Sequence, residues 1–276
     1  MNQVLLSNEL DEQLSKKGFV VVPFLDQNNI LDLRSFFEQH HVAAIPSFYA
    51  TAHVQDVDFR KKMNEKIRQV FEKPIERYFN NCKALGGSFI VKDNQGSQVL
   101  KAHQDWNIVD ESKFRSFNIW VPLLDLTVQN GAIAVIPESH LWVQNFRGPN
   151  IPDDFQYYTD LLFNKVATLE MKAGEAWIYD HRLFHASHAN VSNERRLACV
   201  YGIIPADADM FYYFGNGDKI EVYESNVEFF MNGNIQEGNQ LLKKINAFER
   251  PKLSLDHLPF LRPQKSKKSF FKRWFS

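Results

Sequence analysis

The tripeptide His103-Gln104-Asp105, with His185 and Arg196 further along the chain, constrains this sequence more than any other feature. On an extended strand, residues two apart point to the same face, so the His103 imidazole and the Asp105 carboxylate can reach one metal ion. Two histidines and one carboxylate on one side of a metal, with the opposite positions open, suit non-haem Fe(II) used in oxygen chemistry. An arginine close to the distal histidine can clamp a carboxylate-bearing co-substrate beside that metal.

The second histidine ligand has more than one candidate, because His181, His185 and His188 lie in one short stretch. Alternation from Trp177 onward places His181 and His185 on the same face of a strand. Spacing alone therefore leaves both of them open as the third metal ligand.

Length and composition indicate one enzyme-sized domain. The chain has 276 residues, 44% of them hydrophobic, including 24 Phe, which is enough for one large core. Its 32 basic and 33 acidic residues create no global attraction to nucleic acid, and no nucleic-acid-binding motif is present. We therefore expect no nucleic-acid partner.

The sequence also favours a reducing, cytoplasmic setting. Cys82 and Cys199 are its two cysteines, and its first residues, MNQVLLSNELDEQ, lack a basic leader and a cleavable apolar segment. No run of about 18 apolar residues, the length needed to cross a bilayer, occurs.

The first part of the chain has helical patterns. A helix is expected to end at Gly18 before a strand over Phe19–Pro23, and Asp26 is expected to cap a second helix. A third helical pattern runs from Phe59 past Pro74 to Phe79. The apolar residues Ile30, Leu33, Phe36 and Phe37 of the second helix predict a face packed on a sheet.

From Ser88 onward, short β-rich runs separated by Gly, Asn and Asp turns replace the helical patterns. This order predicts a mainly β fold with flanking helices, a double-stranded β-helix (jelly-roll, cupin-like) barrel buttressed by N-terminal helices. We expect a single domain over residues 1–250 followed by a basic aromatic tail over 251–276. Its predicted parts are a helical part over about 1–83, a barrel over about 84–205 and a C-terminal extension over about 206–250.

Two stretches resemble the phytanoyl-CoA dioxygenase-like family of Fe(II)/2-oxoglutarate oxygenases. Residues 84–142 contain HQDW, the strand-like NIWVPLLD, a turn at Asn130-Gly131 and PESH; residues 174–204 contain HASHANVSNERR. The likeness extends upstream to GFVVVPFL and downstream to about Pro205, which is roughly two thirds of the chain.

The resemblance implies a set of site residues. It selects His185, the histidine of the His-x-Ser element, to complete the metal ligands with His103 and Asp105. It also places Arg196 as the 2-oxoglutarate-binding arginine, whereas the adjacent Arg195 is expected at a solvated strand edge.

Other polar residues near these motifs have weaker assignments. Lys92 and Asn118, on the strands flanking the metal loop, are further candidates for co-substrate binding. His181, His188 and His140 are expected to have packing or turn roles.

The pocket walls can also be predicted. Trp106 and Trp120 are expected to line the pocket, and Val143 to Lys165 has the Pro, Gly and aromatic content of a lid. Arg147 in that lid has two interpretations, contact with an anionic substrate or, by default, a surface position. The aromatic and acidic stretch from Ala206 to Asn239 is expected to form the other wall.

The function implied by the resemblance is hydroxylation of an unactivated C–H bond in a small-molecule or lipid-like substrate. Fe(II), 2-oxoglutarate and O2 would be used, with release of succinate and CO2. Asp105 favours hydroxylation, since related halogenases lack this carboxylate. The alternatives are a non-catalytic cupin-like metal-binding or scaffold protein, and an enzyme that uses the same metal without 2-oxoglutarate.

The tail is a separate signal. Between residues 262 and 276 it carries basic and aromatic side chains and no acidic one. Such a segment can dock on an anionic membrane surface. Peripheral membrane contact is therefore one expectation, and a solvated tail is the other.

Overall fold

The structure of the chain is a computed structural model, which describes residues 3–41, 47–94, 99–232, 235–255 and 258. Its strands are β1 (Phe19–Pro23), β2 (Phe48–Ala50), β3 (Cys82–Lys92), β4 (Leu100–His103), β5 (Phe117–Pro122), β6 (Ile133–Val135), β7 (Ala167–Leu169), β8 (Glu175–Asp180), β9 (His185–Ser187), β10 (Arg196–Pro205), β11 (Phe211–Asn216), β12 (Lys219–Glu224) and β13 (Lys244–Glu249). Its helices are α1 (Asn8–Lys17), α2 (Gln27–His40), η1 (Thr51–His53), α3 (Val57–Tyr78), η2 (Ser139–Leu141), α4 (Thr159–Phe163), α5 (Val227–Asn232), η3 (Ile235–Glu237) and α6 (Gly238–Leu241).

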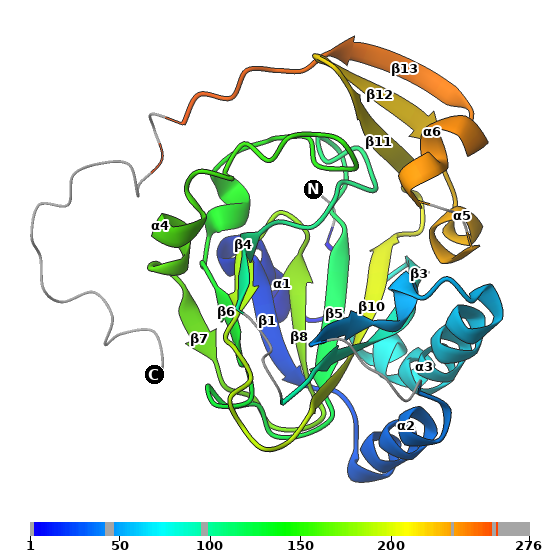
Figure 1. Cartoon of the computed structure of the whole chain (residues 1–276), viewed down its shortest axis with the longest axis vertical. Helices are drawn as coiled ribbons and strands as arrows, with labels where there is room; N and C mark the ends of the chain where they lie inside the picture. The colour runs from blue at the N-terminus through cyan, green and yellow to red at the C-terminus, as the bar shows by residue number, and fades with distance from the viewer. Residues whose placement is uncertain (1–2, 42–46, 95–98, 233–234, 256–257, 259–276) are drawn as a thin grey trace, which may run out of the picture.

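Two antiparallel sheets form the barrel (Figure 1). The larger sheet has the strand order β1-β8-β5-β10-β3-β2, and the smaller has the order β4-β9-β6-β7. Side chains from both sheets pack together between them, including Trp120, Trp177 and Tyr179 from the larger sheet and Ile133 and Val135 from the smaller. The predicted double-stranded β-helix is confirmed.

The N-terminal helices cover the outer face of the larger sheet. Leu33 and Phe37 of α2 and Ile67 and Phe71 of α3 are buried in one cluster with outward residues of the sheet, such as Phe89. At about 25 cal/mol per Å² of apolar surface removed from water, this cluster is a major source of stability. The predicted buttressing role of these helices is confirmed.

The predicted helix boundaries are also close to those observed. Gly18 ends α1 in the left-handed conformation, at φ 83°, and a Cβ there would meet the His140 ring at 2.5 Å. The Asp26 side chain accepts a hydrogen bond from the Asn29 amide and so caps α2. Helix α3 continues through Pro74 and ends at Tyr78, one residue before the predicted end.

The outer face of the smaller sheet is covered by a different part of the chain. Outward alanines on β4, β6 and β9 leave room for Phe155 and for Leu162 of α4, which are fully buried there. Leu258 packs in the same cluster, so the chain after β13 returns to this side of the barrel.

The predicted C-terminal extension contains a third antiparallel sheet, β11-β12-β13. The Phe211 amide donates to the Ile108 carbonyl at 2.9 Å, and the Tyr213 hydroxyl donates to the Val109 carbonyl at 3.3 Å. This sheet therefore contacts the segment that follows the His-x-Asp tripeptide. The exact boundaries predicted for domain, barrel and extension remain predictions.

Two sequence-based expectations concern membranes. Among the described residues, no helix has both the length and the apolar character needed to cross a bilayer. Residues 256–257 and 259–276, the greater part of the predicted tail, lie outside the described residues.

Candidate metal centre and co-substrate site

His103, Asp105 and His185 lie together between the two sheets. Strands β4 and β9 pair antiparallel with His103 directly opposite His185, and the two ring centroids are 4.3 Å apart. One ligand atom from each of the three residues lies within 4.8 Å of the others. In the part of the chain that the structure describes, this is the group of three such side chains suited to hold a metal ion. The predicted ligand set is thus assembled by cross-strand pairing.

Both histidines are oriented by their own backbones. His103 Nδ1 lies 2.8 Å from the Lys101 carbonyl oxygen, and His185 Nδ1 lies 3.0 Å from the Leu183 carbonyl oxygen. A carbonyl can only accept, so each Nδ1 carries the proton and each Nε2 keeps a free lone pair. Nε2 is then the atom available to a metal in both residues.

Asp105 is held by two side chains from the larger sheet. Asn118 Nδ2 on β5 donates to Asp105 Oδ2 at 3.0 Å and to the Tyr179 hydroxyl at 3.2 Å. The Tyr179 hydroxyl on β8 also hydrogen-bonds the Asp105 carboxylate. Asn118 and Tyr179 face each other across β5 and β8, so one strand pair positions both contacts.

The electrostatics leave Asp105 and His185 in their metal-binding forms at neutral pH. Burial alone would raise the pKa of Asp105, but the imidazoles of His185, His181 and His103 and the Tyr179 hydrogen bond outweigh it and lower that pKa to about 2. Burial first, and then the neighbouring His103, lowers the pKa of His185 to about 4. An ionised carboxylate therefore lies beside a neutral imidazole.

Arg196 and Lys92 form a second cluster in the same interior. They are opposite each other on β10 and β3, and their side chains are 1% and 0% exposed. The Arg196 guanidinium lies over the Trp120 ring, 5.4 Å from its centroid, and Nη1 donates to the Gly131 carbonyl at 2.6 Å. Its Nε is buried without a partner among the described residues.

Lys92 connects this cluster to β9, the strand that carries the metal ligand candidate His185. Its Nζ donates to Ser187 Oγ at 2.9 Å and to the His188 carbonyl. Ser187 is two residues beyond His185 on β9, so both point to the same face, roughly 7 Å apart along the strand. Burial, followed by the charge of Arg196, lowers the pKa of Lys92 to about 7.

No described carboxylate lies within 4.0 Å of either cation. Burial also lowers the pKa of Arg196, to about 10. Two buried cations without an anion are costly unless a ligand supplies the negative charge. The cluster therefore has the character of an anion-binding site beside the metal ligands.

The remaining predicted candidates differ in their positions relative to the site. Asn118 donates a hydrogen bond to Asp105 in this structure. Its expected contact with the co-substrate remains a prediction. Arg195 points away from the interior and lies 3.7 Å from Glu38, as expected for a strand-edge arginine. Trp120 lines the interior beneath Arg196, whereas Trp106 is exposed.

The other histidines have structural contacts. His181 Nδ1 hydrogen-bonds Ser116 Oγ at 3.0 Å, and its Nε2 is buried without a partner among the described residues. His188 Nε2 lies 2.9 Å from Thr168 Oγ1, and His140 Nε2 donates to the Ser15 carbonyl at 3.0 Å.

Both interpretations of Arg147 were wrong, because the side chain is neither at the surface nor free to meet a substrate. It is buried in an ion pair with Glu111, with Nη2 to Oε1 at 2.6 Å, and its Nε donates to the Asp105 carbonyl at 2.6 Å. The contact with Glu111 satisfies the charge that burial would otherwise leave unpaired. Arg147 therefore ties its segment to the backbone of a metal ligand.

The predicted lid divides into two parts. Its first part borders the metal loop through Arg147 and packs on the third sheet, where the rings of Phe146 and Tyr213 are 5.4 Å apart. Its second part, with Phe155 and α4, covers the outer face of the smaller sheet. Only the first part lies beside the site.

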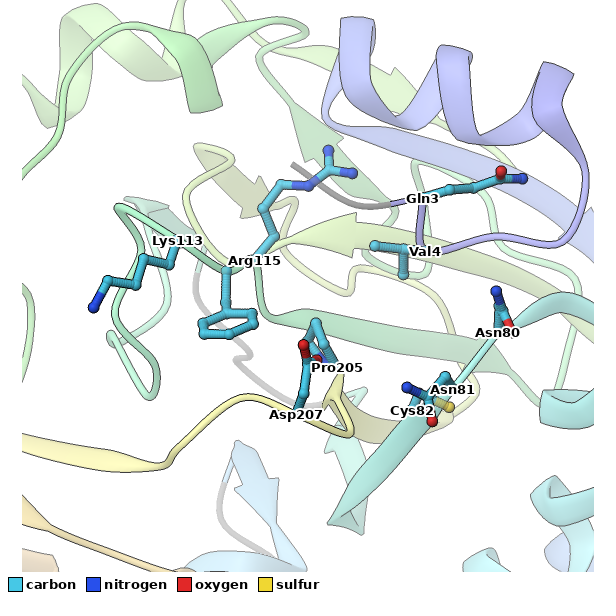
Figure 2. A pocket seen from close by; sticks show the side chains of 10 residues that line it. Gln3, Val4, Asn80, Asn81, Cys82, Lys113, Arg115, Pro205 and Asp207 are labelled. Carbon is cyan, nitrogen blue, oxygen red and sulfur yellow. The ribbon is translucent and has the colours of Figure 1, made fainter.

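A cavity of about 170 Å³ lies apart from these residues (Figure 2). Asn80, Asn81 and Cys82 line it on one side and Arg115 and Lys113 on another, with Asp207 between them. No metal ligand and neither buried cation lines it. We therefore do not assign it as the active site.

Sequence reasoning missed Tyr179 and Ser187 as site residues. A usable signal existed for both, because alternation along β8 and β9 places them on the same faces as the metal-facing residues. No sequence signal identified Glu111 as the partner of Arg147.

Curated relatives of this chain include several dioxygenases. It is 29% identical over 128 residues to dioxygenase trt7 of Aspergillus terreus, covering 44% of this chain and 41% of that protein. It is 28% identical over 140 residues to a phytanoyl-CoA dioxygenase domain-containing protein 1 homologue of Dictyostelium discoideum, covering 47% and 50%. The chain spans about half or less of the length of these two relatives.

Solved structures share the fold at low sequence identity. The non-haem α-ketoglutarate-dependent carbocyclase SnoK from nogalamycin biosynthesis aligns with a TM-score of 0.55 at 17% identity, over 74% of this chain and 86% of SnoK. HygX from Streptomyces hygroscopicus, solved with nickel, 2-oxoglutarate and hygromycin B bound, aligns with a TM-score of 0.54 at 15% identity, over 73% and 88%. The model of the phytanoyl-CoA dioxygenase family matches residues 18–198, which is more than half of the chain and includes all three metal-ligand candidates and Arg196. The family resemblance is confirmed: this chain belongs to the phytanoyl-CoA dioxygenase family.

Proposed function

We propose that this protein is an Fe(II)- and 2-oxoglutarate-dependent dioxygenase that hydroxylates an unactivated C–H bond of a small-molecule or lipid-like substrate. The observation that carries the proposal is the pair of buried cations, Lys92 and Arg196, beside a His-Asp-His ligand set. A metal-binding scaffold has no use for such a pair, because its burial is costly without an anion.

The ligand set fits the metal. His103 and His185 present Nε2 lone pairs, and Asp105 is ionised, so two nitrogens and one oxygen are available on one side of a metal. This donor set is typical of non-haem Fe(II) that keeps open positions for other ligands. Asn118 and Tyr179 hold the carboxylate in place as outer contacts.

The cation pair fits the co-substrate. A 2-oxoglutarate whose keto acid end is at the metal has a second carboxylate four carbons away, and the step from His185 to Ser187 along β9 covers a comparable span. Arg196, with an unpartnered Nε, offers a charge-assisted hydrogen bond to that carboxylate. Lys92 adds a second positive charge from the facing strand.

Fe(II) and 2-oxoglutarate, when bound, supply the oxidation: one O2 converts 2-oxoglutarate to succinate and CO2 and the substrate C–H to C–OH. The protein's own groups bind and orient the reactants and exclude water. Trp177 and Tyr179 stack with ring centroids 3.6 Å apart, and the Trp177 and His185 rings make a T-shaped contact with centroids 5.6 Å apart. They form an apolar wall beside the metal ligands.

Anaerobic titration tests the proposal. Adding 2-oxoglutarate to protein loaded with Fe(II) under nitrogen should produce the weak visible charge-transfer band of a chelated complex, and air should then release succinate. Succinate in parent protein and none in Asp105→Ala is the expected result. Tight iron binding with neither band nor succinate would favour the scaffold alternative, and oxidation of a substrate without 2-oxoglutarate would favour the other enzymatic alternative.

A further inference from the structure

The β11–β13 sheet lies outside residues 18–198, the part of the chain that the family model matches. Its strand β11 is the one nearest the barrel (Figure 1). There it lies against the loop that joins β4 to β5, residues 104–116, which we call the β4–β5 loop. This loop carries Asp105, the one metal ligand candidate of the three that is not on a strand. A ligand on a loop is held precisely only where other contacts fix the loop.

Two hydrogen bonds hold the β4–β5 loop against β11. The Phe211 amide donates to the Ile108 carbonyl at 2.9 Å, and the Tyr213 hydroxyl donates to the Val109 carbonyl at 3.3 Å. Ile108 and Val109 are buried, so their carbonyls depend on partners from the protein. One strand thus fixes two consecutive carbonyls shortly after Asp105.

A second path runs from this sheet to Asp105 through Phe146 and Arg147. The Phe146 ring centroid lies 5.4 Å from that of Tyr213 and 4.9 Å from that of Phe248 on β13. Arg147, the next residue, donates from Nε to the Asp105 carbonyl at 2.6 Å. Strands β11 and β13 therefore both pack against the neighbour of the residue that holds the Asp105 backbone.

The β4–β5 loop and Arg147 are tied to each other at further points. The Arg147 amide donates to Asn107 Oδ1 at 2.5 Å, and the Asn107 amide donates to the Arg147 carbonyl at 3.1 Å. The ion pair of Arg147 with Glu111 is buried. A shift of β11 would break bonds to buried polar groups, which costs free energy, so movement of the sheet and movement of Asp105 are coupled.

The other face of β11 has a different partner. Tyr212, the neighbour of Tyr213, points to the opposite face of the strand, where it packs with Phe229 of α5. Its hydroxyl donates to the Ile235 carbonyl at 2.6 Å. Tyr212 and Tyr213 thus make the same kind of hydrogen bond on opposite faces of one strand, and of these two bonds only that of Tyr213 reaches the β4–β5 loop.

We propose that the β11–β13 sheet positions Asp105 for metal binding, with Tyr213 as the positioning residue, and that metal binding in turn holds this sheet against the barrel. Tyr213 acts through the Val109 carbonyl and, by way of Phe146, through Arg147. This role rests on the proposed metal centre and falls to a part of the chain outside the family match. Because linkage is reciprocal, whatever the sheet contributes to metal affinity must return as stabilisation of the sheet when metal binds.

Tyr213→Phe tests this role, and Tyr212→Phe is its matched control. Each change removes one hydroxyl that donates to a backbone carbonyl and keeps the ring. Calorimetry of the full chain with Mn(II) under nitrogen should show about three- to tenfold weaker metal binding in Tyr213→Phe and parent-like binding in Tyr212→Phe. Both variants should lose a similar amount of thermal stability, so a purely structural role would affect them alike.

Hydrogen–deuterium exchange measures the reciprocal effect. In the parent, saturating Mn(II) should slow exchange of the β11 and β12 amides several-fold more than exchange in α2, which packs on the outer face of the larger sheet. Metal binding stabilises the whole fold, and α2 reports that general effect. In Tyr213→Phe the extra slowing in β11 should shrink, whereas in Tyr212→Phe it should remain.

Two results would overturn the inference alone: the same Mn(II) affinity in the two tyrosine variants, or metal-dependent slowing in β11 no greater than that in α2. Either result leaves the metal centre, and with it the proposed oxygenase function, standing. A parent protein that binds neither Mn(II) nor Fe(II) would instead refute the proposed function, and the role of the sheet with it.

Discussion

Lys92 and Arg196 are direct partners on neighbouring antiparallel strands, and both are buried. Like charges directly opposite each other destabilise a strand pair, and burial adds a further cost for each charge. Burial and the charge of Arg196 lower the pKa of Lys92 to about 7. The amine can therefore lose its proton near neutral pH, which reduces this cost. A dicarboxylate bound between them would offset the remaining cost, in agreement with the co-substrate role proposed for this pair.

Arg196→Ala should weaken 2-oxoglutarate binding by about 10- to 100-fold while iron binding stays close to that of the parent. A charge-assisted hydrogen bond contributes about 1.5–3 kcal/mol, and Arg196 contacts none of the three metal ligands. Calorimetry under nitrogen with Mn(II) in place of iron measures both affinities. Arg195→Ala is the matched control, because that side chain lies at Glu38 outside the site. Equal 2-oxoglutarate affinity in the Arg196 variant and the parent would refute the assignment.

The affinity for 2-oxoglutarate should depend on the protonation of Lys92. Below pH about 7 the Lys92 amine is charged, so the affinity for 2-oxoglutarate should not change with pH. As pH rises above that value, Lys92 of the free protein loses its charge, and the dissociation constant should increase. The same Mn(II) calorimetry from pH 6 to 8.5 measures this slope. Lys92→Met should bind 2-oxoglutarate more weakly and lack the slope; an unchanged slope would assign it to another group.

The ligand-free protein should show the opposite trend in stability. The pKa of Lys92 is lower in the folded protein than its ordinary value of 10.5, so the unfolded chain binds more protons between these two values. The contribution of Lys92 to the free energy of unfolding therefore increases as pH rises from about 7 towards 10.5. Urea unfolding at pH 7 and pH 9, compared between the parent and Lys92→Met, measures this contribution, and identical pH trends would contradict it.

His185→Ala should lose iron affinity by more than the roughly 10- to 100-fold typical of outer contacts, while His181→Ala keeps most of it. His185 is opposite His103 in the β4–β9 pair, whereas His181 bonds Ser116. Equilibrium dialysis with Fe(II) under nitrogen distinguishes the two. Loss of iron in the His181 variant with full affinity in the His185 variant would show that the other histidine is the ligand.

Tyr179→Phe should weaken iron binding about 10- to 100-fold, because Asp105 loses one of the two side chains that orient its carboxylate. Tyr49→Phe is the control, since it removes a buried hydroxyl that has no partner among the described residues. Both variants should melt near the parent temperature. Parent-like iron affinity in Tyr179→Phe would leave Asn118 as the group that positions Asp105.

Arg147→Met should destabilise the protein by about 3–5 kcal/mol, because it leaves Glu111 buried without its partner. Lys66→Met, which breaks the partly exposed pair with Asp32, should cost at most about 1 kcal/mol. Urea unfolding of the two variants gives both values. Similar small losses would mean that water reaches Glu111 and replaces the arginine.

The local sequence was sufficient for features that depend on neighbouring residues. Gly18 and Asp26 mark helix ends through their own backbone and side chain, and the one-residue spacing places His103 and Asp105 on one face. The short β-rich runs after Ser88 predicted the mainly β fold, and the family motifs added Arg196. Each of these signals lies within a few residues or within a quoted motif.

Tertiary structure alone decided the register in which distant residues face one another. The β4–β9 register sets His185 opposite His103. The β3–β10 register sets Lys92 opposite Arg196, and chain packing brings Glu111 to Arg147. The physical reason is that strand register depends on the pairing of whole sheets, and a one-residue slip would turn every side chain to the other face.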